Sequence, residues 1–421
     1  MASTSIQRTP SSAGNRRKFT LSVWCKKHSS SQMNFIGTGG SGDQNHIQFA
    51  SDRFQIRHYA GGTTIIVNTK ALLRDPNAWY HVVCSVDTTQ ATDTNRVKLY
   101  VNGQLAELED TTYPSQNYDW DFNDTTLHTL GRRSFSVDYL FDGIMSHFHW
   151  IDGTAYDASP FGSTDSTTGQ WKINISPSVT YGTNGFFLFK DNASVTDQSG
   201  NSNNWSSTGS LTKTEDCPDN NFAIMNELSK GSDITVSNGN TVVTNSQTSD
   251  QSIVGSIACG NGKYYWEAKC TSNTSNYSNI GITLSSKFGG NHSGVDSGRV
   301  MWSSNGNLYR EGLGLGAVSL GALGTNDIIG VALDTENGTL KFFKGGVLIH
   351  TETNNSFLYS NNEYIPASGL RDGGGWNYNF GNGFFGVTAV SSAGTNASGL
   401  GIFEYDVPTG YTALCTKGLN L

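Results

Sequence analysis

The first residues in this sequence whose types and spacing could do chemistry are pairs of carboxylates. Glu107 and Glu109 stand two positions apart in "RVKLYVNGQLAELED". On a β-strand, residues at that spacing share one face and lie about 7 Å apart. Paired carboxylates at such a distance are the groups that glycoside hydrolysis requires. A second pair, Glu404 and Asp406, occurs in "FEYDVP". Whether these side chains can act depends on the strands that would position them.

A predicted β-hairpin positions the first pair. Its Asn-Gly sequence is the signal for a two-residue type I′ turn, because both central residues of that turn need a positive φ angle. The register of the turn places Lys98 opposite Glu107. In the same way it places Arg96 opposite Glu109. We therefore favour two surface ion pairs over a catalytic pair. The other predicted pairs are Tyr100 with Leu105 on the same face, and Val101 with Gln104, Leu99 with Ala106 and Val97 with Leu108 on the core face.

The same hairpin pattern occurs a second time, in "TLKFFKGGVLIHTE". With a Gly-Gly turn, Phe343 faces Leu348 on the outer side, which matches Tyr100 and Leu105 in the first copy. On the inner side, Phe342 is predicted to face Ile349. The repeat indicates that two domains use one hairpin in one structural role.

Two loops combine aromatic and polar residues in a way that suits sugar recognition. A sugar ring needs a flat aromatic face for its apolar side, with Asp, Asn or Arg beside it for the hydroxyl groups. The loops are "SQNYDWDFND" and "RDGGGWNYNF". In the alternative interpretation, their Trp residues pack on the rim of a sheet and bind nothing. The predicted ligand-binding residues are Tyr118, Asp119, Trp120 and Asp121 in the first loop and Arg371, Asp372, Trp376 and Tyr378 in the second.

Composition narrows the partners that this chain could have. Its 421 residues carry 27 basic and 35 acidic side chains, and a net charge of -8 repels a polyanion unless a basic patch overrides it. The main basic cluster is "RTPSSAGNRRKF", so we expect no nucleic-acid partner. No apolar run approaches the roughly 20 residues that cross a bilayer, and the first residues lack the apolar stretch of a secretory signal. We therefore expect no membrane insertion and folding in a cytosol, with the six cysteines as free thiols.

Short alternating segments predict an all-β protein. In "KFTLSVWCKK", four apolar residues fall on one face of a strand. Similar strands separated by Gly, Asn and Asp turns fill two regions of the sequence, which favours two antiparallel β-sandwiches of the jelly-roll type in tandem. Between them the alternation is lost, apart from "GFFLF". The expected domains are an N-terminal tether at 1–15, a first sandwich at 16–152, a loop-rich connector at 153–218 and a second sandwich at 219–421.

Longer stretches resemble known families. "WYHVVCSVDTTQATDTNRVKLYVNG", followed by "FDGIMSHFHWIDG", resembles the laminin G-like and pentraxin-like modules of the concanavalin A-like superfamily. "GKYYWEAKC", "NIGITL", "DIIGVALDTENGTLKFFKGG", "YIPASGL" and "NYNFG" look like the SPRY domain, which shares that two-sheet architecture. The order of the two modules, with "CPDNNFAIMN" and "VPTGYTALCTKGLNL", is similar to structural proteins of tailed bacteriophages over nearly the whole chain.

This resemblance implies a virion protein that assembles in the host cytoplasm. It would be a fibre or appendage that contacts host-surface glycan or protein, or a capsid or tail decoration protein that binds no receptor. Its partners would be other virion proteins, and we expect a homo-oligomer. Some laminin G-like modules hold Ca²⁺, so the first domain could hold Ca²⁺ as well; no other cofactor is expected. Laminarinase-type hydrolases of the superfamily carry a run such as Glu-x-Asp-x-x-Glu, which this sequence lacks. We therefore expect no enzyme, and a polysaccharide depolymerase is the less favoured alternative.

Overall fold

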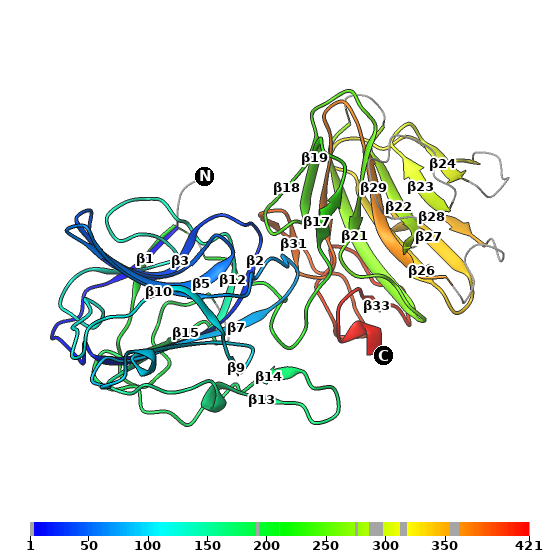
Figure 1. The fold of residues 1–421 in the computed structure, drawn as a ribbon. Coiled ribbons are helices and arrows are strands. Elements are labelled where there is room, and N and C mark those ends of the chain that lie inside the picture. Colours follow the sequence, from blue (N-terminus) through cyan, green and yellow to red (C-terminus); the bar gives the residue numbers. More distant parts are fainter. Residues whose placement is uncertain are drawn as a thin grey trace. The chain divides into compact units, whose positions relative to one another are not determined.

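The chain divides between Lys213 and Thr214 into two units, and antiparallel β-sheets make up most of the regular structure in each (Figure 1). The structure, a computed structural model, describes residues 4–190, 193–209, 211–273, 277–285, 298–311, 318–353 and 362–420. None of the helices in this part of the chain is long and apolar enough to cross a membrane. The prediction of an all-β protein with two concanavalin A-like β-sandwiches is confirmed. The described helices are the 3-10 turns η1 (Asp93–Asn95), η2 (Ser159–Phe161) and η4 (Gly418–Asn420).

Two sheets enclose the core of the N-terminal unit. In the described residues, one sheet has eight strands in the order β10-β6-β5-β4-β3-β11-β1-β16, and the other has six in the order β15-β12-β2-β7-β8-β9. Ile47 and Phe49 from the first sheet share one buried apolar cluster with Leu21 and Val23 from the second. The strands of the eight-stranded sheet are β1 (Ser5–Arg8), β3 (Met33–Gly40), β4 (Asp43–Ala50), β5 (Arg53–Ala60), β6 (Thr63–Thr69), β10 (Leu108–Thr112), β11 (His128–Leu130) and β16 (Ser206–Thr208). Those of the six-stranded sheet are β2 (Lys18–Lys27), β7 (Tyr80–Asp87), β8 (Val97–Val101), β9 (Gln104–Leu105), β12 (Gly143–Asp152) and β15 (Phe186–Leu188).

Strand β2 is buried on both faces. The four alternating apolar residues of "KFTLSVWCKK" lie in the core, as their pattern predicts. The opposite face is also covered, and Trp24 is only 4% exposed. The cover is the segment after β12, in which Phe161 packs with Val83 and Ile151 of the six-stranded sheet. It includes a small hairpin of β13 (Gly162–Thr164) and β14 (Trp171–Ile173). We call residues 153–181 the N-terminal cover.

The segments predicted as a tether (1–15) and as a connector (153–218) differ from the structure, because most of both belongs to the N-terminal unit. β1 pairs with β11 and β16 in the eight-stranded sheet. The connector supplies the N-terminal cover, β16 and β15, and only β15 coincides with the predicted strand "GFFLF". The sequences of these segments do not alternate between apolar and polar residues, because hydrogen bonds to other parts of the unit hold them in place. Asp152, for example, accepts the backbone N–H of Asn15 at 2.7 Å and that of Asn184 at 2.9 Å.

The C-terminal unit repeats the two-sheet plan. In the described residues, one sheet has the order β17-β20-β29-β22-β23-β24-β25, and the other has the order β18-β19-β30-β21-β26-β27-β28, with β33 parallel to β21. Trp266, Trp302 and Trp376 lie in the cluster between them. The strands of the first sheet are β17 (Met225–Lys230), β20 (Gln251–Gly255), β22 (Asn279–Leu284), β23 (Arg299–Ser303), β24 (Asn307–Glu311), β25 (Val318–Ser319) and β29 (Tyr364–Leu370). Those of the second are β18 (Ile234–Ser237), β19 (Val242–Asn245), β21 (Lys263–Ser272), β26 (Ile328–Asp334), β27 (Thr339–Lys344), β28 (Val347–Glu352), β30 (Gly374–Asn379) and β33 (Thr412–Ala413); β31 (Phe384–Phe385) pairs separately with β32 (Thr388–Ala389).

A C-terminal segment covers the outer face of β21 in this unit. Phe403 packs edge-on against Tyr265, with ring centroids 5.1 Å apart. The fully buried carboxylate of Glu267 accepts the backbone N–H groups of Glu404 at 2.8 Å and Tyr405 at 2.9 Å, and the Tyr265 hydroxyl at 3.0 Å. We call residues 403–415 the C-terminal cover.

The first predicted hairpin forms at its tip. φ is 47° at Asn102 and 80° at Gly103, and Tyr100 pairs with Leu105. Further along, the chain leaves β8 and enters the other sheet, where β10 pairs with β6. A type I′ turn fixes only the strand residues beside it, and the sequence does not show where the second strand changes sheets. Three predicted pairs are therefore wrong, namely Val97 with Leu108, Lys98 with Glu107 and Arg96 with Glu109.

The two carboxylates after this hairpin form ion pairs with other partners. Glu107 lies 3.1 Å from Nζ of Lys70, and Glu109 lies 2.7 Å from Nη1 of Arg53. Both cations come from the eight-stranded sheet or its edge, which the chain joins after the turn. The carboxylates thus take part in surface ion pairs, as expected, although neither partner is the predicted one.

The second hairpin is shifted by one residue below its turn. φ is 58° at Gly345 and 78° at Gly346, and Phe343 pairs with Leu348 as predicted. A register shift follows, so Phe342 faces His350; the predicted pairing of Phe342 with Ile349 is wrong. The bulge keeps Phe342 fully buried in the core.

An aromatic side chain from a cover lies over each hairpin turn. A Cβ atom at Gly103 would lie 2.4 Å from the ring of Trp171, and one at Gly346 would lie 2.7 Å from the ring of Tyr405. Both positions therefore need glycine for close approach as well as for their positive φ. The repeated hairpin has the same role in both units, since each copy supports a cover on the outer face of its sheet.

Candidate ligand-binding site

Three of the four aromatic residues predicted to bind sugar lie in the two cores, and the fourth, Tyr118, is partly buried against the N-terminal core. Trp120, Trp376 and Tyr378 are all 0% exposed. Trp120 packs edge-on against Phe19, and Trp376 belongs to the cluster between the C-terminal sheets. These side chains cannot form a platform for a ligand without unfolding, so their assignment as ligand-binding residues is wrong. An aromatic residue in a polar loop can turn inward or outward, and here burial of a large apolar surface favours the inward orientation.

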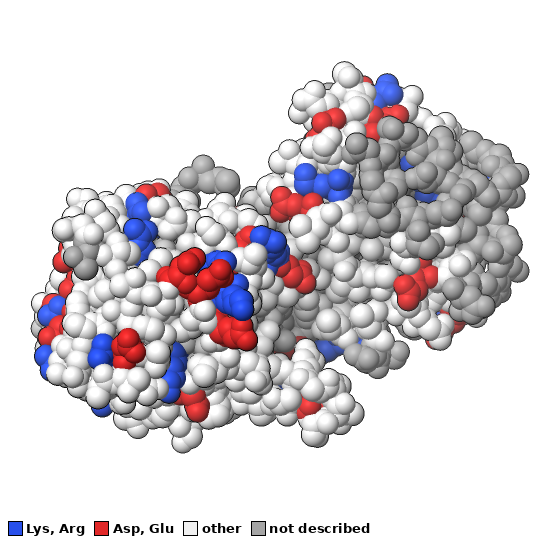
Figure 2. Space-filling model, viewed as in Figure 1, with Lys and Arg blue, Asp and Glu red and all other residues white. Residues whose placement is uncertain are grey.

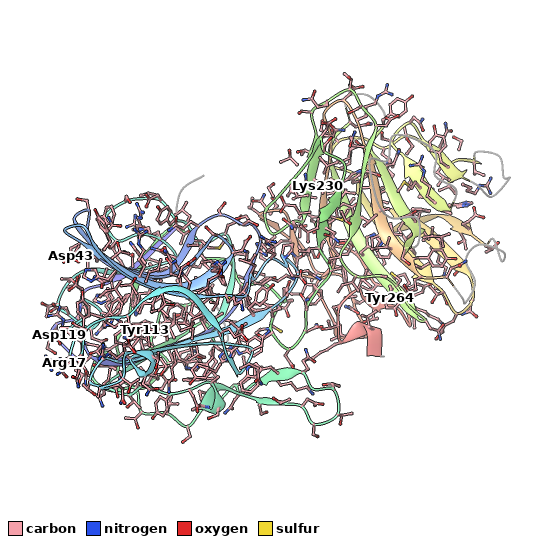
Figure 3. The ribbon with its side chains drawn as sticks, in the orientation of Figure 1. Arg17, Asp43, Tyr113, Asp119, Lys230 and Tyr264 are labelled. Carbon is pink, nitrogen blue, oxygen red and sulfur yellow. The ribbon has the colours of Figure 1, made fainter. Side chains whose placement is uncertain are left out.

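The polar residues of the same two loops remain at the surface, where they form ion pairs. Asp119 binds Arg17 at 2.8 Å, and both side chains are labelled together in Figure 3. Arg371 lies 3.0 Å from Asp372 and stacks over the ring of Tyr277 at 4.1 Å. The structure thus separates the predicted polar residues from their aromatic neighbours, and neither loop forms a combined sugar site.

A polar pocket of about 410 Å³ lies instead on the outer face of the six-stranded sheet. Its volume is within the usual range for small-ligand sites. One wall comes from β7 and β8, a second from the loop around η1, and a third from the start of the N-terminal cover. The lining residues are Ser85, Asp87, Gln90, Asn95, Lys98, Tyr100, Ala155 and Asp157.

Strand alternation explains which side chains reach the pocket. In β8, Val97 and Leu99 are fully buried in the core, so Lys98 and Tyr100 point to the outer face. Asp157 comes from the cover, about 60 residues later. Its Oδ1 accepts the backbone N–H of Ser159 at 2.9 Å, which holds the carboxylate at the start of η2. The pocket therefore combines residues that lie far apart in the sequence.

Burial, hydrogen bonds and neighbouring charges set the protonation states of Asp87 and Tyr100 in the pocket. Burial opposes ionisation of Asp87, but hydrogen bonds from Thr89, Gln90 and Lys18 outweigh it and lower the pKa of this carboxyl. Burial and the negative charge of Asp157 raise the pKa of Tyr100, so its hydroxyl stays protonated. A ligand would meet carboxylate acceptors, an ammonium group, amides and one phenol ring in the same space.

The second carboxylate pair, Glu404 and Asp406, lies in the C-terminal cover and is held by local hydrogen bonds. Glu404 accepts the backbone N–H of Ser391 at 2.8 Å. Asp406 accepts the backbone N–H of Thr395 at 2.6 Å, and this bond lowers its pKa. These bonds give both residues a structural role in fixing the surface of the cover.

The predicted basic cluster is matched by acidic residues. Arg16 pairs with Asp121 at 2.9 Å, and Lys18 pairs with Asp87 at 3.2 Å. On the face of the N-terminal unit in Figure 2, Lys and Arg side chains lie beside Asp and Glu side chains. The positive charge of this segment is thus neutralised locally.

The acidic loop also brings Asp121 close to two residues of the β4–β5 hairpin. Ligand atoms of Asp43, His58 and Asp121 all lie within 4.8 Å of one another. Ca²⁺, which the resemblance to laminin G-like modules leaves possible for this domain, takes six to eight oxygen ligands. The imidazole of His58 does not suit that preference, so this group does not resemble a Ca²⁺ site.

Comparison with known families identifies both units. Residues 2–159 match the family described as the concanavalin A-like lectin/glucanases superfamily, and residues 263–383 match the SPRY domain. The chain carries a concanavalin A-like domain and a SPRY domain. The pocket and the Asp43–His58–Asp121 group both lie in the first unit; the residues from 43 to 157 that form them fall within the matched concanavalin A-like domain.

Three solved structures are similar to part of the chain. The SPRY domain of human HERC1 is 18% identical, with a TM-score of 0.32, and the match covers 37% of this chain and 96% of that chain. The stonustoxin structure is 16% identical, with a TM-score of 0.31 and coverage of 37% and 27%. The TRIM65 PSpry domain is 13% identical, with a TM-score of 0.30 and coverage of 37% and 88%. Comparison with curated protein sequences gives no match. The functional argument therefore rests on the residues of the sites.

Proposed function

We propose that this chain is a non-enzymatic binding protein whose concanavalin A-like domain takes a carbohydrate in the pocket beside Tyr100. The observation that carries the proposal is the mixture of groups in that pocket. Each hydroxyl of a sugar both donates and accepts a hydrogen bond, which suits carboxylates, amides and an ammonium group side by side. The Tyr100 ring offers an apolar face for the sugar ring.

Other ligand classes suit the pocket less well. A polyanion would meet Asp87 and Asp157, which repel it. An apolar ligand would remove water from these polar groups without pairing them, at a cost of about 1–3 kcal/mol for each group. A neutral glycan avoids both penalties, so it is the class of ligand that the pocket favours.

We further propose that the binding protein is part of a virion, assembled in the host cytoplasm with other virion proteins and as a homo-oligomer. This proposal rests on the resemblance of the module order to structural proteins of tailed bacteriophages. Glycan on the host surface would then be the ligand of the pocket. An antibody against the chain should label intact particles from infected cells, and labelling of soluble material alone would contradict the virion location without affecting the pocket.

The pocket is tested by two substitutions and one matched control. Lys98→Ala removes a donor, and Asp157→Asn removes a charge while keeping the Oδ1 bond to Ser159. Lys70→Ala removes an exposed lysine of the eight-stranded sheet edge, outside the pocket. Hydrogen bonds to charged groups contribute about 1.5–3 kcal/mol, so we expect each pocket variant to weaken binding at least about tenfold.

The measurement is binding of the full chain to an array of host-surface glycans, followed by titration of the glycans that bind. The Lys70→Ala control should bind like the parent protein. If the two pocket variants retain full affinity for every glycan bound by the parent, the pocket is not the binding site. If the parent binds no glycan, the proposed ligand class is wrong.

A further inference from the structure

The inner face of the β4–β5 hairpin carries apolar residues inside the core. Toward the edge of the sandwich it carries residues of types that can bind a metal. Ile47 and Phe49 of β4, and Ile56 of β5, lie in the core cluster. Because side chains alternate along a strand, Asp43 and His58 continue the same two rows toward the edge of the sandwich. Asn45 lies directly opposite His58 in the register.

The loop after β10 closes over this end of the hairpin and adds a second carboxylate. Asp121 Oδ2 accepts a hydrogen bond from Nδ2 of Asn45 at 2.7 Å. Nε2 of His58 lies 2.6 Å from Oδ1 of Asp43. Figure 3 labels Asp43 on the same side of the N-terminal unit as Asp119 of this loop. Two carboxylates and one imidazole therefore converge from three separate segments.

We propose that Asp43, His58 and Asp121 form a site for a divalent transition metal, with Zn²⁺ as its representative. An imidazole with two carboxylates is a donor set that Zn²⁺ accepts, and water can complete the four ligands. The side chain of Asp43 is 55% exposed, so the site opens to solvent on one side. His58 is only 12% exposed, which keeps its imidazole in place.

A buried oxygen without a hydrogen-bond partner in the described part of the chain lies on Asn45, the residue that donates to Asp121. Asn45 is 0% exposed, and its Oδ1 has no hydrogen-bond partner among the residues that the structure describes. Nδ2 of the same side chain donates a hydrogen bond to Asp121, so this oxygen belongs to a residue that contacts one of the three proposed ligands. A buried carbonyl oxygen without a partner costs free energy, and a metal ion or its bound water can satisfy it.

The surroundings of the ligands suit a metal site. Nδ1 of His58 contacts the Tyr118 hydroxyl, which fixes the ring with Nε2 directed at Asp43. Arg16 donates to Oδ1 of Asp121 at 2.9 Å, so this ligating carboxylate has an outer partner.

The test uses the full chain, freed of metal with a chelator and titrated calorimetrically with ZnCl₂, and separately with CaCl₂. We expect one Zn²⁺ per chain and at least a tenfold lower affinity for Ca²⁺. Co²⁺ in place of Zn²⁺ should give visible absorption bands typical of four ligands that include nitrogen. Absence of saturable Zn²⁺ binding, or tighter binding of Ca²⁺ than of Zn²⁺, overturns the proposal.

Variants assign the site to these residues. His58→Gln and Asp121→Asn should abolish the stoichiometric site, and Tyr118→Phe, a change in a positioning residue, should weaken it about tenfold. Should His58→Gln fail to fold, Asp43→Asn tests the same ion at the exposed edge. His350→Gln is the matched control, because His350 pairs with Glu352 at 3.4 Å outside this group. Equal Zn²⁺ binding by the parent, His58→Gln and Asp43→Asn would show that the metal binds elsewhere.

Discussion

Substitution of Glu267 by Gln tests how the C-terminal cover is held on the SPRY domain. The carboxylate is fully buried and accepts three hydrogen bonds, two of them from backbone N–H groups of the cover. Gln keeps the shape of the side chain but offers one acceptor oxygen in place of two. One backbone N–H of the cover then faces an NH₂ group, and a buried donor without a partner costs about 1–3 kcal/mol.

The size of this effect depends on pH. Burial raises the pKa of Glu267 to about 7 from an ordinary value of 4.5, against the hydrogen bonds from Glu404, Tyr405 and Tyr265. Between these two values the folded protein binds more protons than the unfolded chain, so its stability falls as the pH rises. The stability linked to the proton is fully present below pH 4.5 and is lost as the pH passes 7. At about 1.4 kcal/mol per unit of pKa difference, the loss is about 3 kcal/mol.

Gln carries no such proton, so the cost of Glu267→Gln should be largest near pH 4.5; near pH 8 it should be about 3 kcal/mol smaller, so that the substitution is neutral or stabilising there. Urea denaturation at several pH values, followed by Trp fluorescence, measures this difference. Hydrogen exchange of the peptide that contains Glu404 and Tyr405 shows whether the cover detaches first. Glu336→Gln, at a half-exposed glutamate of the same unit outside the cover, serves as the control. A cost of Glu267→Gln that stays level or grows with pH would mean that the buried carboxylate is ionised throughout, and the reasoning would fail.

Three further substitutions follow from the structure. Asp52→Asn leaves the ammonium group of Lys27, which is 1% exposed and 2.5 Å from Asp52, without its close counter-ion. Thermal unfolding should show a loss of about 3–5 kcal/mol in the free energy of unfolding. A change below about 1 kcal/mol would contradict the buried pair. Gly346→Ala places a Cβ atom against Tyr405 at a φ of 78° and should cost roughly 1–3 kcal/mol in urea denaturation; a neutral effect would show that the cover does not press on the turn. Trp376→Ala should destabilise the SPRY domain by about 3–5 kcal/mol and leave glycan binding by the other domain unchanged, whereas loss of glycan binding with stability intact would return Trp376 to the ligand-binding residues.

The sequence predicts those parts of the fold in which burial alternates along a strand. "KFTLSVWCKK" shows the apolar face of β2, and the Asn-Gly and Gly-Gly pairs show two turns, because few other residues accept a positive φ. It does not predict the covers. Their positions are fixed by hydrogen bonds to buried carboxylates such as Asp152 and Glu267, and in a sequence these acids look like surface residues.

The sequence does not predict the polar pocket for a related reason. Asp87 and Asp157 line one space although 70 positions separate them, and they meet only because the cover folds back over β7 and β8. Part of the Asp43–His58–Asp121 group could be predicted from the sequence. Asp43 and His58 occupy the core-facing rows of two alternating strands, where polar residues are uncommon, and this signal could have drawn attention to them.

The two domains differ in how a cover fills the outer face of one sheet, and the proposed ligand pocket follows from this difference. In both, the repeated hairpin places an aromatic residue on that face, Tyr100 in one and Phe343 in the other. Phe343 packs with the cluster that contains Phe403, so the C-terminal cover fills the space beside it. The N-terminal cover borders the space beside Tyr100 and leaves a pocket. Tyr100 also packs against the cluster that contains Phe161 of its cover, so the two domains differ in the pocket that remains beside this contact in the N-terminal unit, where we propose that a polar ligand binds.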